Sequence, residues 1–230
     1  KYRIKDSSSR QALKALADKV NFTWNYVNDL SFRYFKRFAK SETFPFLSAY
    51  DINKYTTGSS KELGLPAQTI QAVNEEYVKS RKQHKRVRLS WRSCKRSLGW
   101  IPFKAASIRV LEDYVLFQGE KFRIYKRRAL PLGALITHGS FNQDARGRWY
   151  VSISFKAREW QHKHTSEEVG IDLGVKDSIV TSTENKFETP RFNELKSNLA
   201  IAQSNRKKKQ VQNLHAKIKN SRLDFFHKVT

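Results

Sequence analysis

The sequence predicts an α+β protein with more than one domain, and three observations lead to this fold class. Apolar residues recur at steps of three and four through most of residues 8–86, which is typical of helices. From about residue 100 the spacing changes to alternation, which is typical of antiparallel strands. A final section opens with an apolar strand and continues into a basic helical segment. We therefore expect a helical block, an antiparallel β block that curls into a small barrel, and the start of an α/β unit.

The composition indicates a folded protein with a polyanionic partner. Of the 230 residues, 39% are hydrophobic and 13% are aromatic, which is enough for a real core. The chain has 45 Lys and Arg against 21 Asp and Glu, a formal net charge of +24. A single basic cluster is ordinarily a solvated face, but an excess over the whole chain favours nucleic acid. A membrane-surface protein is disfavoured, because no amphipathic basic helix is set off from the rest.

Cysteine usage and hydropathy exclude several classes. Cys94 is the single cysteine, so no disulfide forms within the chain and no Cys-rich zinc site fits within these residues. We expect Cys94 to be a small core or loop residue. No stretch approaches the ~18 apolar residues of a membrane span, and no signal peptide is visible. The sequence begins without Met and ends inside an expected helix, so we expect part of a longer product.

The first hundred residues read as a short strand followed by helices. "KYRIK" (1–5) alternates, and Ser8 with Gln11 predicts a capping box at the start of a long helix to about residue 39. Shorter helices are expected over 48–57 and over 66–86, the second running into the basic run "SRKQHKRVR". The long helix has one apolar face, formed by Leu13, Leu16, Val20, Trp24 and Val27.

The block 100–157 predicts a small antiparallel barrel or curled sheet. "SIRVLEDYVLFQG" and "KFRIYKRR" alternate, with Gly119 marking a turn. "ALITHGSF" and "RWYVSISF" flank "NQDARG", which reads as a hairpin connection. Trp149, Val151, Ile153 and Phe155 are expected to share one face. The strand at the N-terminus is expected to join this sheet.

The last third reads as a polar linker and an α/β unit. "KAREWQHKHTSEE" (156–168) is the linker, and its "HKH" (162–164) is either a solvated loop or a metal-binding pair. A strand in 167–183, a second strand near 178–183 and a basic helical segment from about residue 192 follow. The apolar stripe of that segment is Val211, Leu214, Ile218, Phe225 and Val229.

Asp172 lies in the apolar strand "VGIDLGVKDSIV". Period-two alternation places it with Gly170 and Gly174 on the face opposite Val169 and Ile171, where a bulky group has room to approach. A buried carboxylate is costly unless it is paired or bound to a metal, and Mg²⁺ favours carboxylate oxygens. Two interpretations stay open: a metal ligand beside a phosphodiester, or the turn chemistry of an Asp before a Gly. Asp177 reads mainly as a turn residue.

Aromatic residues lie among basic ones in "SLGWIPFK" (97–104). Trp100 and Phe103 either stack on bases or plug the β block. The basic runs "RKQHKRVR" and "NRKKK" are interpreted as phosphate contacts, which position a nucleic acid without reading its sequence. The candidate nucleic-acid-binding residues are Lys85, Arg86, Arg88, Lys95, Arg96, Trp100, Lys104, Arg206, Lys207, Lys208, Lys209 and Arg222.

Several of these segments resemble a known family. "VGIDLGVKDSIVTST" resembles the first RuvC motif of the TnpB (OrfB) family of transposon-encoded RNA-guided endonucleases, relatives of the type V CRISPR effectors. "NLHAKIKNSRLDFFHKVT" (213–230) is similar to the basic helix that follows that motif, with its pattern "LHxKIxNxRxDFxHK". "RWYVSISF" resembles the strand before the nuclease domain, and "RSLGWIPFK" occurs in a subset of relatives. The N-terminal helical block fits by position and character only.

The resemblance implies an oligonucleotide-binding-like wedge barrel with an inserted helical recognition lobe, followed by a RuvC-like, ribonuclease-H-like α/β nuclease domain. In these terms residues 1–6 are the first wedge strand, 7–99 the recognition lobe, 100–165 the wedge barrel and 166–230 the first part of the nuclease domain. Asp172 takes the position of the first catalytic acid and Mg²⁺ ligand. The second catalytic Glu, the paired-cysteine zinc element and the last catalytic Asp have no counterpart in these residues.

The resemblance also implies the activity and the partners. We expect an RNA-guided DNA endonuclease that binds a structured guide RNA and target DNA, in the prokaryotic cytoplasm at the nucleoid. Two alternatives stay open. The first is a guide-RNA-dependent DNA-binding regulator of the same fold that does not cut. The second is a structural RNA-binding protein, which accounts for the charge but not for "GIDLGVKD".

Overall fold

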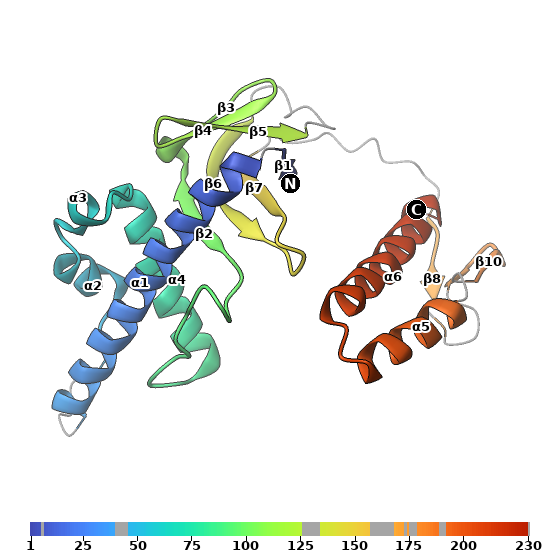
Figure 1. Cartoon of the computed structure of the whole chain (residues 1–230), viewed down its shortest axis with the longest axis horizontal. Helices are drawn as coiled ribbons and strands as arrows, with labels where there is room; N and C mark the ends of the chain where they lie inside the picture. Colours follow the sequence, from blue (N-terminus) through green and yellow to red (C-terminus); the bar gives the residue numbers. More distant parts are fainter. Residues whose placement is uncertain are drawn as a thin grey trace. The chain divides into compact units, whose positions relative to one another are not determined.

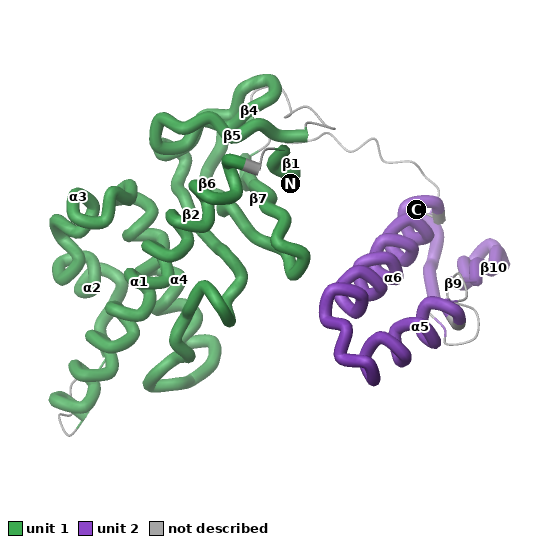
Figure 2. Tube along the Cα trace, in the orientation of Figure 1, with its two compact units in different colours: residues 1–159 green, residues 160–230 purple. Residues whose placement is uncertain are grey.

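The computed structural model describes residues 1–5, 7–39, 46–125, 134–156, 168–172, 174, 179–188 and 192–229. The chain forms two compact units, residues 1–159 and residues 160–230 (Figure 2). Each unit is described separately.

Unit 1 begins with a three-residue strand and a long helix, and three further helices follow before its β block (Figure 1). The helices that the periodicity predicts are present in the structure. One further short helix, which the sequence pattern did not indicate, lies between the second and third predicted helices. Gly58 and Gly64, both at positive φ, bound this short helix. The elements are β1 (Tyr2–Ile4), α1 (Ser7–Phe38), α2 (Ala49–Tyr55), α3 (Ser59–Leu63) and α4 (Ala67–His84).

The expected capping box at Ser8 is wrong, because Ser8 lies inside α1 rather than before it. A capping box exists instead at α2. There the Ser48 hydroxyl accepts from the Asp51 N–H at 3.2 Å, and the Asp51 carboxylate accepts from the Ser48 N–H at 3.0 Å. The Ser48 side-chain and backbone hydrogen bonds lower the pKa of the Asp51 carboxyl. Ser8 and Ser48 are each followed, three residues later, by a side chain that can accept a hydrogen bond from the serine N–H. The surrounding chain therefore decides which serine caps a helix.

The β block forms a seven-stranded sheet in which every neighbouring pair is antiparallel. The spatial order is β2-β6-β7-β1-β5-β4-β3, so the N-terminal strand lies in the middle, between β7 and β5, as expected. The strands are β2 (Trp100–Lys104), β3 (Ile108–Val110), β4 (Tyr114–Phe117), β5 (Glu120–Tyr125), β6 (Leu135–Gln143) and β7 (Trp149–Lys156).

The sheet curls into a nearly closed barrel, as its connections require. The two edge strands, β2 and β3, follow each other in the sequence and are joined by one 3₁₀ turn, Ala105–Ser107. A connection this short brings the opposite edges of the sheet together. Aromatic rings fill the interior: Phe103 of β2 lies 6.1 Å from Phe117 of β4 and 5.5 Å from Phe141 of β6, between ring centroids. The prediction of a mixed α+β chain with a barrel is therefore confirmed.

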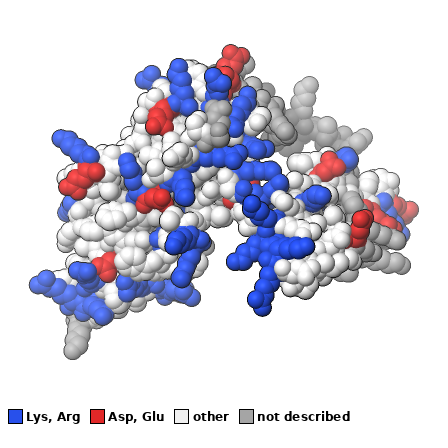
Figure 3. Space-filling view, in the orientation of Figure 1, with Lys and Arg blue, Asp and Glu red and all other residues white. Residues whose placement is uncertain are grey.

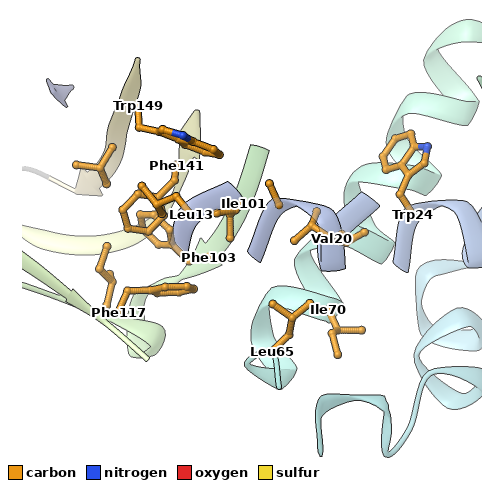
Figure 4. Close-up of a cluster of buried hydrophobic side chains, with 14 of the residues drawn as sticks. Leu13, Val20, Trp24, Leu65, Ile70, Ile101, Phe103, Phe117, Phe141 and Trp149 are labelled. Atoms are coloured by element: carbon orange, nitrogen blue, oxygen red, sulfur yellow. The ribbon is translucent and has the colours of Figure 1, made fainter. Parts of the chain in front are cut away.

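One core connects the barrel to the helices of unit 1. Leu13 and Val20 of α1 are fully buried and belong to the same cluster as Ile101 and Phe141 of the barrel (Figure 4). Trp149 and Val151 of β7 are buried as expected, whereas Phe155 at the far end of that face is exposed. The barrel and helices of unit 1 thus stabilise each other.

Turn chemistry explains where the β strands end. Gln118 and Gly119, with φ of 53° and 79°, form the two-residue turn between β4 and β5 that Gly119 indicated. The hairpin around "NQDARG" is confirmed, since β6 and β7 pair from Gln143↔Trp149 onwards. The segment "SIRVLEDYVLFQG" alternates throughout, yet it forms two strands, β3 and β4, that pair with each other. The alternating pattern does not reveal the turn between β3 and β4.

The described residues of unit 2 form a small three-stranded sheet and two helices. Strand β8 is an edge strand and pairs with β9, which pairs with β10. The basic helical segment is two helices rather than one, because the chain turns at Arg206, which has a φ of 53°. The elements are β8 (Ile171–Asp172), β9 (Ile179–Thr181), β10 (Lys186–Phe187), α5 (Asn193–Ser204) and α6 (Lys208–Val229).

The stripe expected on the last helix packs on α5. Leu214 is buried, and Val211, Ile218 and Phe225 are half-buried; nothing is described of the Val229 side chain. Among the described residues, no helix has the length and apolarity that crossing a membrane requires.

Candidate nucleic-acid interface

A row of asparagines on α1 fixes the irregular segment between α4 and β2. The Asn28 side chain donates to the Leu89 carbonyl at 2.8 Å and accepts from the Leu89 N–H at 3.0 Å. The Asn25 side chain makes the same two bonds with Arg92, both at 2.8 Å. Each amide therefore replaces the strand partner that this stretch of backbone lacks. The segment 85–98, which we call the basic arm, is held to the helix at two points of its backbone.

Arg92 makes a third attachment with its side chain. Its Nε donates to the Asn21 side chain at 2.9 Å, and one terminal nitrogen donates to the Leu98 carbonyl at 3.0 Å. The guanidinium also lies over the rings of Trp24 and Trp100, at 5.7 and 5.4 Å from their centroids. Burial lowers the pKa of Arg92. Arg92 therefore joins α1, the basic arm and β2.

A groove of about 680 Å³ lies between α4 and the outer side of the barrel. Trp24 and Trp100, packed edge to face with centroids 6.2 Å apart, line it together with Arg92. The barrel side of the lining combines serine hydroxyls with Trp100, Lys104 and His138, and the α4 side is mostly charged. The remaining polar and charged lining residues are Glu75, Glu76, Lys79, Ser80, Lys104, His138, Ser140, Ser152 and Ser154.

Charge in the groove is mixed. The Lys104 ammonium contacts the Glu75 carboxylate at 2.7 Å, so the expected phosphate contact at Lys104 has an acidic neighbour. Trp100 is half-buried and lines the groove, whereas Phe103 is 1% exposed and plugs the barrel. A groove with hydroxyl groups, one aromatic wall and balanced charge suits hydrogen bonding to sugars and base edges.

The basic arm itself carries mostly uncompensated positive charge. Lys85, Arg86, Lys95 and Arg96 are exposed, and no ion pair between them and an acidic side chain is found within the described ranges. Arg88 differs, since its guanidinium lies 3.6 Å from the Asp29 carboxylate and 4.8 Å from the centroid of Phe32. In Figure 3, Lys and Arg side chains stand over much of the visible surface, while Asp and Glu are scattered singly.

One arginine of the interpreted phosphate-binding run has another role. Arg81 is 5% exposed, donates to the Ser31 hydroxyl at 2.9 Å and to the Leu47 carbonyl at 3.1 Å, and lies 4.4 Å from the centroid of Phe46. Burial lowers the pKa of Arg81. The interpretation of the whole run as phosphate contacts is therefore wrong for Arg81, which ties α4 to α1 and to the start of α2.

Sequence reasoning missed the asparagines and Trp91. Trp91 is 54% exposed, next to the clamped Arg92, whereas the sequence interpretation chose Trp100. The spacing of Asn21, Asn25 and Asn28 at four and three residues places them on one side of a helix, which was the available signal. Cys94, expected in the core or a loop, is exposed in the arm.

In unit 2 the predicted basic residues cluster at the turn between the two helices. Arg206, Lys207, Lys208 and Lys209 are all exposed there. The Arg222 guanidinium lies 5.6 Å from the centroid of the buried Phe192 ring, so part of this side chain serves packing within the unit. Contacts of these residues with a nucleic acid stay a prediction.

Asp172 ends β8 and pairs with Val180 of β9. It is exposed, and so are Val169 and Ile171, with 54% and 61% of their surface accessible. Within the described part of unit 2, both faces of this strand are therefore exposed. In the ranges that the structure describes, no three His, Cys, Asp or Glu side chains form a group that would hold a metal ion. Leu173, Asp177, His162 and His164 lie outside the described residues.

Part of the chain is similar to a curated protein. The chain is 34% identical over 116 residues to a curated protein of Streptomyces pristinaespiralis named "Putative RNA-guided DNA endonuclease". The match covers 45% of this chain and 29% of that protein, so it spans less than a third of the relative's length. No family model matches the chain.

Proposed function

We propose that this chain is part of an RNA-guided DNA endonuclease of the TnpB type. The observation that carries the proposal is the similarity to a protein named as an RNA-guided DNA endonuclease. Three independent features support it: the net charge of +24, the barrel with its helical insertion, and the motif "GIDLGVKD" with its Asp at residue 172.

In this proposal unit 1 is the wedge barrel with its recognition lobe, and it binds guide RNA and target DNA. The groove between α4 and the barrel supplies hydroxyl and charged partners, while the exposed lysines and arginines of the basic arm contact phosphates. Unit 2 is the first part of a RuvC-like domain. Its three-stranded antiparallel sheet followed by helices is consistent with the opening of such a domain.

The proposed cofactor is Mg²⁺, with Asp172 as one carboxylate ligand. The side chain fits this role because its carboxylate is exposed at the end of β8. A second Mg²⁺ ion would require further carboxylate ligands beside Asp172. When bound, Mg²⁺ would stabilise the negative charge that develops during phosphodiester hydrolysis. Asp172 would contribute one carboxylate oxygen as a ligand and so fix the position of the ion.

The test uses the full-length gene product, purified with its co-expressed RNA. We expect guide-dependent cleavage of DNA that requires Mg²⁺, and we expect Asp172→Ala to reduce the cleavage rate by at least about 10³-fold, as loss of a metal ligand does. RNA and DNA affinities of this variant should stay within about two-fold of the parent. Glu194→Ala is the matched control, since Glu194 is an exposed acid of unit 2 that lies outside the segments resembling the family. Normal cleavage by Asp172→Ala would refute the metal assignment.

The same experiment separates the two alternatives. RNA-dependent DNA binding without cleavage by the parent protein would identify a regulator of the same fold. RNA binding without any guide-dependent DNA binding would instead favour a structural RNA-binding protein.

A further inference from the structure

We propose that the basic arm, residues 85–98, is a preformed binding surface for single-stranded RNA, with Trp91 as the platform on which an unpaired base stacks. The choice of RNA rests on the proposed function. The surface itself rests on the exposure of Trp91, on the charges around it, and on the asparagine clamps beneath it.

Trp91 is an exposed aromatic side chain on the basic arm. It leaves 54% of its surface accessible, while Trp24, Trp100 and Trp149 are buried or half-buried in the core or the groove. Arg88 lies over the Trp91 ring at 5.6 Å from its centroid. That guanidinium is in turn held by Asp29 and Phe32 of α1, so one neighbour of the indole is fixed.

The backbone on both sides of Trp91 is fixed as well. Leu89 and Arg92 each exchange two hydrogen bonds with an asparagine of α1. The Asn28 side chain, which makes the two hydrogen bonds to Leu89, is 0% exposed. A polar side chain thus lies in the interior of unit 1, at a position that an apolar side chain would otherwise fill. A surface already held in one shape loses little conformational entropy when a ligand binds, which favours affinity.

The charge around the indole matches a polyanion. Lys85, Arg86, Lys95 and Arg96 are exposed along the arm, and the arm has no acidic residue. An exposed aromatic among free cations is the arrangement that binds single strands: cations follow the backbone and the ring stacks on a base. A duplex offers the same phosphates, but its bases already stack on one another. Of the two nucleic acids in the proposed function, guide RNA has unpaired bases before the target duplex is opened, so we take RNA as the partner; the DNA strand that pairing displaces is the alternative that the experiment tests.

The experiment measures binding of the full chain to three fluorescein-labelled ligands of equal length, oligouridylate, oligothymidylate and an RNA duplex, by fluorescence anisotropy. We expect Trp91→Ala to weaken oligouridylate binding about ten-fold. Duplex affinity and the salt dependence of both should stay unchanged, because no cation is lost. Trp91→Phe should keep oligouridylate affinity within about three-fold of the parent, since a smaller ring still stacks.

Two controls accompany these variants. Leu111→Ala removes an exposed apolar side chain outside the arm, 43% accessible, and should change neither affinity. Lys95→Ala should weaken both ligands alike and lower the salt slope for oligouridylate by about 0.7, the value for one phosphate contact on a single strand.

The inference is overturned if Trp91→Ala binds oligouridylate like the parent, if it loses duplex affinity equally, or if the loss is confined to oligothymidylate. The stacking role would also be refuted if Trp91→Phe weakened oligouridylate binding as much as Trp91→Ala does. None of these outcomes depends on cleavage. Failure of the Asp172 test would refute the metal assignment and leave this measurement valid.

Discussion

Individual side chains in unit 1 decide the shape of segments that have no regular structure. Asn25, Asn28 and Arg92 together fix the arm, and Arg81 fixes the approach to α2. All are polar residues with buried or half-buried side chains, and each makes hydrogen bonds to a backbone carbonyl or N–H that lacks another partner. Such groups are costly to leave unpaired, so single substitutions here have large effects.

We expect Asn28→Ala to lower the free energy of unfolding by about 2–4 kcal/mol. The substitution leaves the buried Leu89 N–H and carbonyl without partners and removes the acceptor of the Tyr77 hydroxyl, 3.4 Å away. Urea denaturation followed by tryptophan fluorescence measures the loss. Gln11→Ala, an exposed polar truncation on the same helix, should stay within about 0.5 kcal/mol. Equal stability of the two variants would contradict the clamp.

How much of the site the sequence could predict depends on the kind of signal. The basic residues of the arm are visible in the sequence, and their exposure follows from charge. The role of Arg81 could not be predicted, because its partners, Ser31 and Leu47, are distant in the sequence and polar or backbone groups. Likewise nothing local distinguishes Trp91 from Trp100; only the packing of Trp100 on Trp24 does.

At the scale of elements, periodicity predicted the helices and most strands, and it failed where a turn or cap decides. It did not separate β3 from β4 or α5 from α6, since both breaks fall between stretches with the same pattern. It also placed a capping box at Ser8, which lies inside α1. Two predictions follow from features of single elements.

The first concerns Gly139 of β6. A Cβ at this position would overlap the Ser152 carbonyl oxygen and the Phe103 ring. We expect Gly139→Ala to destabilise unit 1 by about 1–3 kcal/mol, as overpacking does. Ser152→Ala, which changes the neighbouring strand without adding volume, should stay within about 0.5 kcal/mol. Thermal unfolding of the two variants under one condition checks this, and an unaffected Gly139→Ala would show that the barrel wall is not tight here.

The second concerns the capping box of α2. Ser48→Ala should cost about 1 kcal/mol at neutral pH, whereas Ser8→Ala should cost nearly nothing, because Ser8 caps no helix. The hydrogen bonds lower the pKa of Asp51 below its ordinary value of 3.8. The carboxylate's share of the stabilisation is therefore present above about pH 4 and is lost as the pH falls through the folded-state pKa. Urea titrations at several pH values should show the Ser48→Ala difference shrinking towards low pH; a difference that grows on acidification would contradict the assignment.

At the scale of the whole molecule, the net charge of +24 makes the folded chain repel itself. We expect polyanions such as heparin or RNA to raise the melting temperature, because they bind the folded surface and neutralise it. RNA affinity should fall steeply as NaCl rises, by about 0.7 in the logarithmic slope for each phosphate contact on a single strand. Anisotropy titrations over a NaCl series measure this slope. A flat dependence would mean that the charge serves another purpose.

The position of β1 at the middle of the barrel also constrains the order in which unit 1 folds. Tyr2 pairs with Val151, so the strand translated first waits for a partner translated about 150 residues later. At roughly 5–20 residues per second, this delay is on the order of 10 s. The helices α1 to α4 contact one another without β7 and are free to pack during that time. Until β7 emerges, the edge of β1 that later pairs with β7 has no partner, and open strand edges pair with other chains. Folding yield during synthesis should therefore depend on how fast residues 126–151 are translated.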